Sequence, residues 1–389
     1  MALTQVSTGG VKDDAITKAK IPANQIEASE LADNAVDTNA IANGAVSNAK
    51  IADDAITQAK INVPIINRNL IINGAMQVSQ RGTSFAATDQ IYMLDRYKME
   101  KSGNAANFTV TQSTTSPDGF AKSLKLDCTA ADTSTGSNEF VAIRYKIEAQ
   151  DLQHLAYGTS AAKALVLSFY VRSNLTGTYG VTCLQRDNSS KLYARTYTIN
   201  SADTWERKTI SIPADTSGVI NDDNGSGFEI YFPLVLGSNY KGGAVSTAWE
   251  TYSNAKFGSQ HGVNIGSSTS NEWYLTGLQL EVGSVVTDFE HRSLAQELAL
   301  CQRYYEENNC TWAGFTRAAQ GNGSLYIAYK VTKRAVPTLS TKTAATSVQN
   351  LTSQNLGDAT LSNFIVDTRI NSSGYGRFYD LLAASDAEL

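Results

Sequence analysis

The chain has 389 residues, a formal net charge of −5 at pH 7 and 18% charged residues. That length suffices for two or three domains. The charge is scattered and forms no basic stripe, which argues against a nucleic-acid partner. No apolar run is long enough for insertion into a membrane.

The first sixty residues follow a strict period of five. One large apolar residue recurs at every fifth position, and the residues between are mostly small or polar. The apolar positions are Val11, Ile16, Ile21, Ile26, Leu31, Val36, Ile41, Val46, Ile51, Ile56 and Ile61. Five residues advance an α-helix by about 140°, and an odd spacing alternates between the two faces of a strand. The chain must therefore change direction once in each repeat.

Three structures are compatible with this period over residues 1–63. Short helical turns, each with its own cap, would pack from three chains into a trimeric supercoil whose core is the residues Ile16 to Ile61. A square coil would use four pentads per turn. A disordered leader is the third alternative, because one large apolar residue in five buries little in a monomer. We favour the supercoil, which would make residues 1–63 a stalk.

In residues 64–292, short segments typical of β-strands alternate with turn residues. The segments are rich in Val, Ile, Tyr, Phe and Thr, and several alternate in polarity. The expected strands are 107–113, 123–128, 139–148, 164–173, 179–186, 192–199, 206–213, 227–237 and 272–282. No long segment of helical period interrupts them. Such a pattern is typical of an antiparallel β-sandwich, and we predict a jelly roll.

The pattern changes at Ser293. Apolar residues then follow at helical spacing, and Ser293 and Gln296 form a Ser-x-x-Gln capping box. These features predict a helix from 293 to about 306. Strands are expected again at 324–331, 363–370 and 376–383. Residues 293–389 are therefore expected to form a linking helix and a small β-rich tip domain, so that the whole fold is mainly β.

The sequence offers no motif for catalysis, a metal or a cofactor. The three histidines lack metal-ligand spacing, and neither a Gly-x-Ser-x-Gly elbow nor a phosphate loop occurs. Asp222-x-Asn224-x-Ser226 resembles half of a calcium loop, but Pro233 stands where the closing glutamate belongs. We expect a polar turn there. The four cysteines have no Cys-x-x-Cys spacing, so buried free thiols are expected.

One loop combines the residue types that bind sugars. An aromatic ring can stack on the C–H face of a pyranose, and neighbouring amides and carboxylates can bind its hydroxyl groups. The candidate residues for glycan binding are Trp249, Glu250, Tyr252 and Asn254. The alternative is that Trp249 closes one end of the sandwich core.

Several motifs resemble those of tailed-bacteriophage fibre proteins. Asn69-Leu-Ile-Ile-Asn-Gly and Leu94-Asp-Arg-Tyr look like the opening strand of fibre domains with a carbohydrate-binding-module jelly roll. The run Trp273-Tyr-Leu-Thr-Gly-Leu-Gln-Leu-Glu-Val-Gly283 and the following Phe289-Glu-His-Arg292 are similar to the C-terminal halves of such fibres. The pentads resemble the N-terminal repeats of tail and head fibres.

The resemblance implies a homotrimeric, non-catalytic virion protein. Its N-terminus would bind other virion proteins, and its distal domains would bind a host-surface polysaccharide or receptor. The start of the chain lacks a secretory signal, whereas the body has an extracellular composition, which suits release by lysis. A capsid-mounted head fibre, a structural spacer and a polysaccharide depolymerase remain alternatives.

Overall fold

The computed structural model describes residues 67–103, 106–187 and 190–389. The predicted stalk, including the apolar positions from Ile16 to Ile61, lies outside these residues, so the supercoil stays a prediction. Within the described residues, no helix is long and apolar enough to cross a bilayer.

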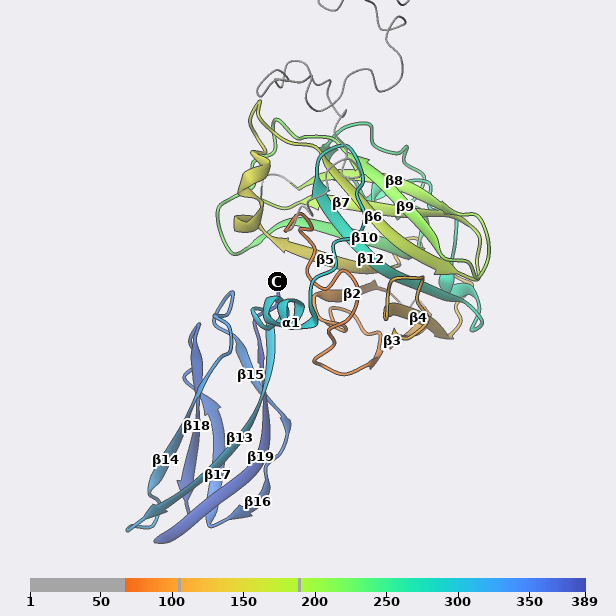
Figure 1. Cartoon of the computed structure of the whole chain (residues 1–389). Coiled ribbons are helices and arrows are strands. Elements are labelled where there is room, and N and C mark those ends of the chain that lie inside the picture. Colours follow the sequence, from red (N-terminus) through yellow and green to blue (C-terminus); the bar gives the residue numbers. More distant parts are fainter. Residues whose placement is uncertain (1–66, 104–105, 188–189) are drawn as a thin grey trace, which may run out of the picture. The chain divides into compact units, whose positions relative to one another are not determined.

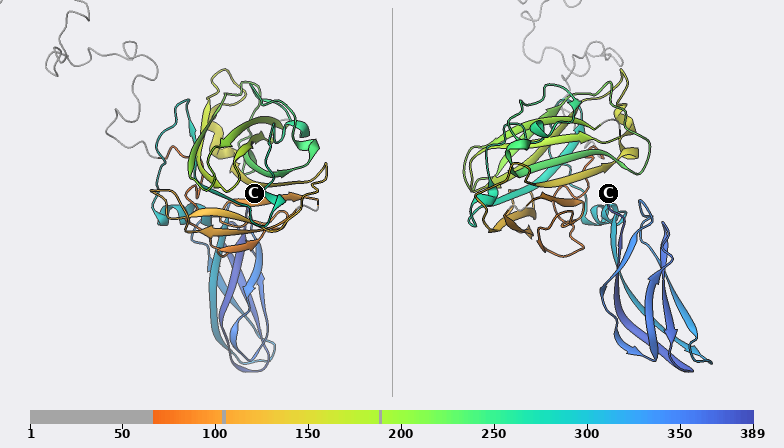
Figure 2. Two further views of the ribbon diagram at one scale, coloured as in Figure 1. Left: turned by 90° about the vertical axis from the view of Figure 1, so that its right-hand side faces the viewer. Right: turned by 180° about the vertical axis from the view of Figure 1, so that it is seen from behind.

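Twelve strands form a mainly β sandwich of two antiparallel six-stranded sheets (Figures 1 and 2). Sheet A has the order β1 (Ser84–Ala86), β3 (Asn107–Ser113), β4 (Ser123–Ala130), β12 (Glu272–Val282), β6 (Leu165–Ser173) and β9 (Glu206–Ile212). Sheet B has the order β11 (Glu250–Thr251), β8 (Lys191–Ile199), β7 (Gly177–Gln185), β10 (Ser226–Leu236), β5 (Phe140–Glu148) and β2 (Tyr97–Ser102). This is the arrangement of a jelly-roll sandwich.

The main core lies between the two sheets. Alternate side chains of each strand point inward, as the period of an extended chain requires. Phe169 of β6 meets Phe232 of β10 edge to face at a ring-centroid distance of 5.1 Å, and Phe232 also contacts Trp273 of β12 at 5.9 Å. These three side chains have at most 1% of their surface exposed. Aromatic contacts of this kind hold sheet A against sheet B.

The structure confirms all nine strands expected in the sandwich, with each end within two residues of the predicted position. Sequence analysis missed β1, β2 and β11. It also missed four short 3-10 helices: η5 (Ala149–Leu155), η6 (Ser238–Tyr240), η7 (Asn254–Lys256) and η8 (Ile265–Ser267).

The expected opening strand at Asn69–Gly74 was wrong. Asn69 Oδ1 accepts hydrogen bonds from the amides of Ile71 (3.0 Å) and Leu280 (3.1 Å), and Asn73 adopts a left-handed φ of 60°. The backbone pairs with β12 only at two points, from the Leu70 amide to the Leu280 carbonyl oxygen (2.9 Å) and from the Leu278 amide to the Gly74 carbonyl oxygen (2.9 Å), and the chain turns between them. The Leu94-Asp-Arg-Tyr motif lies at the same corner. Asn73 Nδ2 donates to the carbonyl oxygens of Val78 (2.8 Å) and of Asp95 in that motif (3.0 Å).

A single α-helix, α1 (Leu294–Gln302), follows the sandwich, and the predicted capping box of Ser293 and Gln296 is present. The helix ends four residues earlier than expected. Tyr304 is buried beneath the Arg96 guanidinium, with the Arg96 Cζ atom 3.4 Å from its ring centroid, and β13 begins at the next residue. The packing of Tyr304 against Arg96 therefore ends the helix.

The C-terminal part contains two smaller antiparallel sheets. One pairs β13 (Tyr305–Thr316) and β15 (Thr338–Thr343) with β19 (Gly374–Asp386), and β16 (Thr346–Gln349) also pairs with β19. The other has the order β14 (Asn322–Ala328), β18 (Asn363–Ile370) and β17 (Leu351–Gly357). Their shared core includes Cys310, Phe364, Val366, Phe378 and Leu381. The three strands predicted here are present, and β13, β15, β16 and β17 were missed.

The polar turn expected at 222–227 has a structural role. Asn224 Nδ2 donates to the Arg334 carbonyl oxygen (2.7 Å), and Arg334 Nη1 donates back to the Asn224 carbonyl oxygen (2.6 Å). The turn thus contacts the segment after β14. All four cysteines are buried and free, as predicted.

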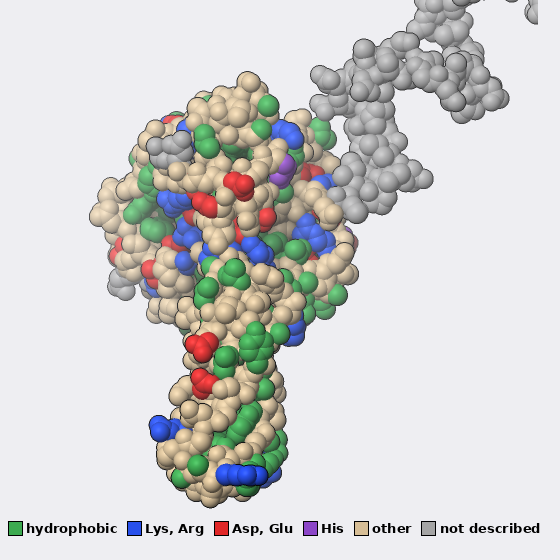
Figure 3. Space-filling view, turned by 90° about the vertical axis from the view of Figure 1, so that its left-hand side faces the viewer, with side chains coloured by type: hydrophobic (Ala, Val, Ile, Leu, Met, Phe, Trp, Pro, Cys, Tyr) green, Lys and Arg blue, Asp and Glu red, His purple; other side chains and the backbone are tan. Residues whose placement is uncertain are grey.

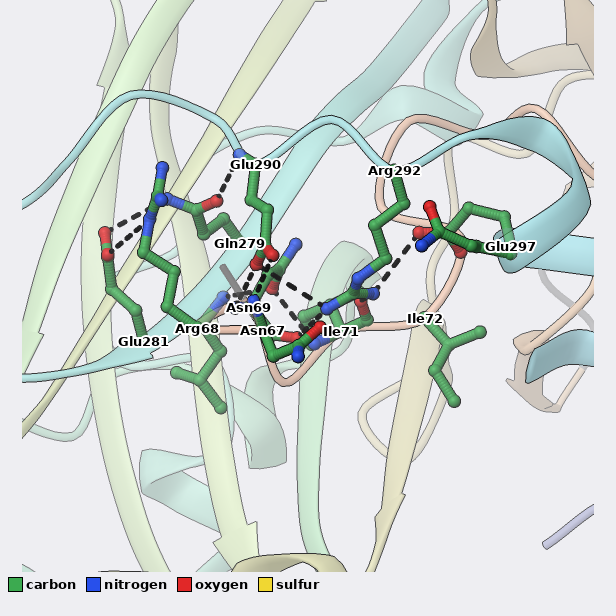
Figure 4. A network of polar contacts seen from close by, with 12 residues as sticks. Asn67, Arg68, Asn69, Ile71, Ile72, Gln279, Glu281, Glu290, Arg292 and Glu297 are labelled. Atoms are coloured by element: carbon green, nitrogen blue, oxygen red, sulfur yellow. Dashed lines mark hydrogen bonds and ion pairs between the residues drawn. The ribbon is translucent and has the colours of Figure 1, made fainter. Parts of the chain in front are cut away.

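A polar network joins the start of the sandwich to its closing segment and to α1 (Figure 4). Glu290 Oε2 accepts from the Asn69 amide (2.7 Å), and Glu297 Oε2 of α1 accepts from the Asn73 amide (2.6 Å). Arg292 lies between these acids and donates to the Ile71 carbonyl oxygen (3.0 Å) and to Glu297 Oε1 (3.2 Å). The network therefore connects the junction of the sandwich and α1 through Glu290 and Arg292.

Candidate functional site

Residues 237–262 lie across one half of the outer face of sheet B, and we call them the covering loop. Its backbone approaches the sheet closely: Thr182 Oγ1 donates to the Phe257 carbonyl oxygen, and the Gly262 amide donates to the Thr178 carbonyl oxygen (2.9 Å). A β-carbon on Gly258 would lie 1.9 Å from Leu236 Cδ1. Any larger residue at this position would require the Leu236 side chain to move.

A second apolar cluster is sealed beneath this loop. Phe257 of the loop contacts Tyr231 of β10 with ring centroids 5.1 Å apart, and the cluster is completed by Ala142, Leu184, Leu192, Ala194 and Leu236. It lies on the opposite side of sheet B from the main core. The loop therefore shields apolar surface that an open sheet would expose to water.

Trp249 packs into the main core. Its ring is half-buried and lies 5.7 Å from Tyr193 and 5.8 Å from Phe228, measured between ring centroids. Its indole Nε1 donates to the Pro213 carbonyl oxygen at 2.8 Å. These are the contacts expected if Trp249 closes the core, and its predicted glycan contact stays a prediction.

The other three candidates lie apart from the Trp249 ring. Tyr252 packs on the outer cluster with Leu192, and Asn254 is exposed at the start of η7. Glu250 Oε1 accepts from Ser246 Oγ (2.6 Å), and its other oxygen pairs with Lys256. Trp249 and Tyr252 flank the two-residue strand β11, and their rings lie on opposite faces of sheet B: Trp249 packs on the main core and Tyr252 on the outer cluster. The structure therefore does not bring the two aromatic rings into one platform.

The uncovered half of sheet B carries a row of charged side chains that sequence analysis missed. Arg144 of β5 bridges Glu100 of β2 and Glu229 of β10. Glu229 Oε2 also accepts from Arg186 Nε (2.9 Å) and from the Tyr231 hydroxyl (2.9 Å). We call these residues, with Lys98 and Lys146 on the same face, the charged row. Figure 3 shows basic and acidic side chains intermixed on the face of the sandwich that it presents.

The register of the strands creates the charged row. Lys98 lies opposite Arg144, and Lys146 lies opposite Glu229. Charged residues alternate along β2 as Lys98-x-Glu100 and along β5 as Arg144-x-Lys146, and that spacing of two places them on one face. This alternation is the signal that could have predicted a polar outer face. The pairing across strands depends on register alone.

Glu229 of the charged row stays ionised near neutral pH. Burial raises the pKa of Glu229, but the guanidinium groups of Arg144 and Arg186 outweigh this effect and hold that pKa below its ordinary value. Burial lowers the pKa of Lys146 to about 8. Glu229 is thus a fixed carboxylate acceptor and lacks the raised pKa that a general acid requires. Arg186, with 37% of its side chain exposed, is the member placed to meet a ligand.

His261 anchors the end of the covering loop and should make the fold sensitive to acid. Its Nδ1 accepts from the Gly180 amide (3.1 Å), and burial lowers the pKa of its imidazole to about 4. The unfolded chain binds a proton near pH 6.5, so stability is constant above that pH and falls as pH decreases toward 4. We expect a loss of about 2 kcal/mol between pH 7 and pH 5.

Urea unfolding at both pH values tests this expectation, with His261→Gln as the control because glutamine does not titrate. The variant should lose clearly less stability than the natural chain over that interval. Equal losses in the two proteins would contradict the assignment to His261.

No family model matches the chain, and no curated protein matches it. Among solved structures, the chain is similar to the enzymatically active domain of tailspike protein 4 of bacteriophage CBA120, with 12% identity and a TM-score of 0.30. That match covers 55% of this chain and 21% of the other, so the chain spans about a fifth of the tailspike domain.

Two carbohydrate-binding modules are also similar. A CBM4 structure has 13% identity and a TM-score of 0.30, and the match covers 54% of this chain and 98% of that chain. The xylan-binding domain CBM22-1 of Paenibacillus barcinonensis Xyn10C has 10% identity and a TM-score of 0.25, with 56% and 96% covered. These likenesses are distant. The strand pairing alone defines the fold.

Proposed function

We propose that the chain is a bacteriophage virion fibre protein that attaches to the host surface by non-catalytic, multivalent glycan recognition. The motifs that resemble phage fibres supply the virion context, and a trimer formed through residues 1–63 would supply several copies of each site. Linked copies raise the avidity of a weak site by about 10² to 10⁴ when they can bind simultaneously.

The observation that carries the glycan part of the proposal is the charged row on the open half of sheet B. Sugar hydroxyl groups accept hydrogen bonds from fixed guanidinium donors. Arg186, with 37% of its side chain exposed, offers such a donor, and the buried Glu229 carboxylate, which pairs with both Arg186 and Arg144, holds that guanidinium in position. Because the strands hold these groups in place, little side-chain freedom is lost on binding.

Replacing Arg186 by alanine should reduce adsorption of the full chain to host cells. Arg186 is the exposed donor of the row, and its loss removes a charge-assisted contact worth roughly tenfold in affinity at each site. Adsorption and glycan-array binding are measured together, and light scattering on the same samples gives the number of copies. Incubation with host polysaccharide, followed by an assay for new reducing ends, tests the depolymerase alternative.

Arg369→Ala is the matched control, because Arg369 is exposed on β18, away from the row. It should leave adsorption unchanged. Undiminished adsorption of Arg186→Ala, or an equal loss in both variants, would contradict this placement of the site.

A further inference from the structure

A separate hollow of about 480 Å³ opens on the outer face of sheet A, the opposite sheet from the charged row. Its lining comes from the turn between β3 and β4, from β6 and from the turn before β9. The lining residues are Ser116, Pro117, Asp118, Tyr170, Thr204 and Trp205. The volume lies within the range of ligand pockets, roughly 300–1,000 Å³.

Two aromatic rings of the hollow are held in place from behind. Trp205 packs edge to face on Tyr274 of β12, with ring centroids 5.9 Å apart. Tyr170 lies 5.3 Å from Phe120, whose ring also meets Phe289 at 5.0 Å. Rings fixed in this way present apolar surface without further loss of freedom on binding.

Trp205 differs from the other tryptophans of the sandwich. Trp273 is fully buried in the core, and the Trp249 indole donates to a carbonyl oxygen. Trp205 is half-buried and belongs to none of the apolar clusters, and within the described residues its indole N–H has no hydrogen-bond partner. Core packing therefore does not account for this ring or its donor.

The rim of the hollow offers oxygen acceptors. The Phe120 amide donates to the Pro117 carbonyl oxygen (3.1 Å), and Gly119 has a φ of 85°, so a tight turn holds Asp118 at its corner. Asp118 is exposed and makes no hydrogen bond or ion pair in the part of the chain that the structure describes. The Thr204 hydroxyl donates to the Ala202 carbonyl oxygen (3.1 Å), which leaves its own lone pairs available.

The charges near the hollow favour an uncharged ligand. Arg172 is paired with Asp203 (2.9 Å) and Glu272 (3.0 Å), and Arg207 donates to the Thr287 carbonyl oxygen. Asp118 is the one ionised side chain in the lining. Its negative charge accepts hydroxyl donors and repels carboxylates or phosphates.

We propose that this hollow binds a neutral hexopyranose unit of a glycan. The C–H face of the sugar stacks on Trp205, next to Tyr170, whose ring already lies beneath the Arg207 guanidinium with 5.9 Å between Arg207 Cζ and the ring centroid. The hydroxyl groups of the sugar donate to Asp118 and to the Thr204 and Ser116 oxygens. The indole N–H of Trp205 donates to a sugar oxygen. The inference rests on the proposed carbohydrate-binding function and adds a second site with a different preference, on the other sheet.

Fluorine NMR on the full chain labelled with 5-fluorotryptophan tests the proposal. The chain contains four tryptophans, so four signals are expected, each assigned with a single Trp→Phe variant. The probes are cellohexaose, laminarihexaose, maltohexaose, an acidic alginate hexamer and the neutral fraction of host surface polysaccharide. We expect the Trp205 signal to move with a neutral probe and to stay unmoved with the alginate hexamer.

Calorimetric titration of each variant with the probe that moves the Trp205 signal measures how much the replaced residue contributes to binding affinity. Trp205→Ala should weaken binding about tenfold, as for an aromatic anchor at the centre of a site. Asp118→Ala, at an exposed turn, should weaken it several-fold without affecting folding, which keeps the test valid if Trp205→Ala unfolds. Tyr326→Ala, at a residue 62% exposed on β14, is the aromatic control and should bind as the natural chain does.

The outcomes separate this inference from the proposed function. A Trp205 signal unmoved by every neutral probe, or binding unchanged by Asp118→Ala, overturns the site on sheet A. If Arg186→Ala still abolishes host adsorption in that case, the proposed function stands without the second site. If neither Arg186→Ala nor Trp205→Ala changes adsorption and no probe binds, both proposals fail.

Discussion

Replacing Lys333 by alanine is expected to lower the free energy of unfolding by about 3 kcal/mol, because it leaves the buried Glu306 carboxylate with only the largely exposed Lys330 ammonium, 3.6 Å away, as its cation. Lys333 and Glu306 form an ion pair at 2.6 Å, and both side chains are fully buried. The Lys333 ammonium also donates to the carbonyl oxygen of Gln302, the last residue of α1, where a cation is favoured. Urea unfolding followed by circular dichroism measures the loss.

The double variant Lys333→Met, Glu306→Leu is the control for this expectation. It removes both charges and retains apolar volume, so it should be more stable than Lys333→Ala by at least about 2 kcal/mol. If the double variant is as unstable as the single one, lost packing rather than an unpaired charge explains the effect. A loss below about 1 kcal/mol in Lys333→Ala would contradict the argument itself.

Replacing Arg292 by alanine is expected to cost about 3 kcal/mol, because one guanidinium holds several parts of the network in Figure 4. Its donors reach the carbonyl oxygens of Asn69 and Ile71 and the Glu297 carboxylate. Without it, the carboxyl groups of Glu290 and Glu297, with at most 10% of their side chains exposed, lose their shared cation. Thermal unfolding and amide hydrogen exchange at residues 69–73 report the change.

Arg292→Lys separates charge from geometry at this position. Lysine keeps the positive charge but lacks the planar fork that reaches several acceptors at once, so an intermediate stability is expected. Full recovery by lysine would show that charge alone matters. Unchanged exchange at residues 69–73 in Arg292→Ala would contradict the assigned contacts.

The sandwich strands could be predicted because their information is local. Strands β3, β10 and β12 are rich in β-branched and aromatic residues and are bounded by turns, so their ends can be predicted from the local sequence without knowing which strands they pair with. Strand β2 was missed because three of its six residues are charged, and its outer face is stabilised by partners such as Arg144, 44 positions from Glu100. The helix end was misjudged because Arg96, far away in sequence, buries Tyr304.

The candidate site was less predictable than the fold. Composition drew attention to the loop around Trp249, but the side of the sheet that each ring occupies depends on the extended backbone of β11. The charged row is assembled from strands whose members lie as far apart as Glu100 and Glu229, and only the register brings them together. Local sequence patterns indicate which residues are charged, and pairing decides which of them meet.

The spacing of Trp249 and Tyr252 has a consequence for how such a surface could change. If one residue were inserted between them, the side chains on one side of the insertion would move to the opposite face of the sheet, because side chains of an extended backbone alternate between the two faces at every residue. If the shifted segment is the one that carries Trp249, its ring moves to the outer side of sheet B, where Tyr252 already packs. A single inserted codon would therefore exchange core stability for a larger aromatic surface on that side of the sheet.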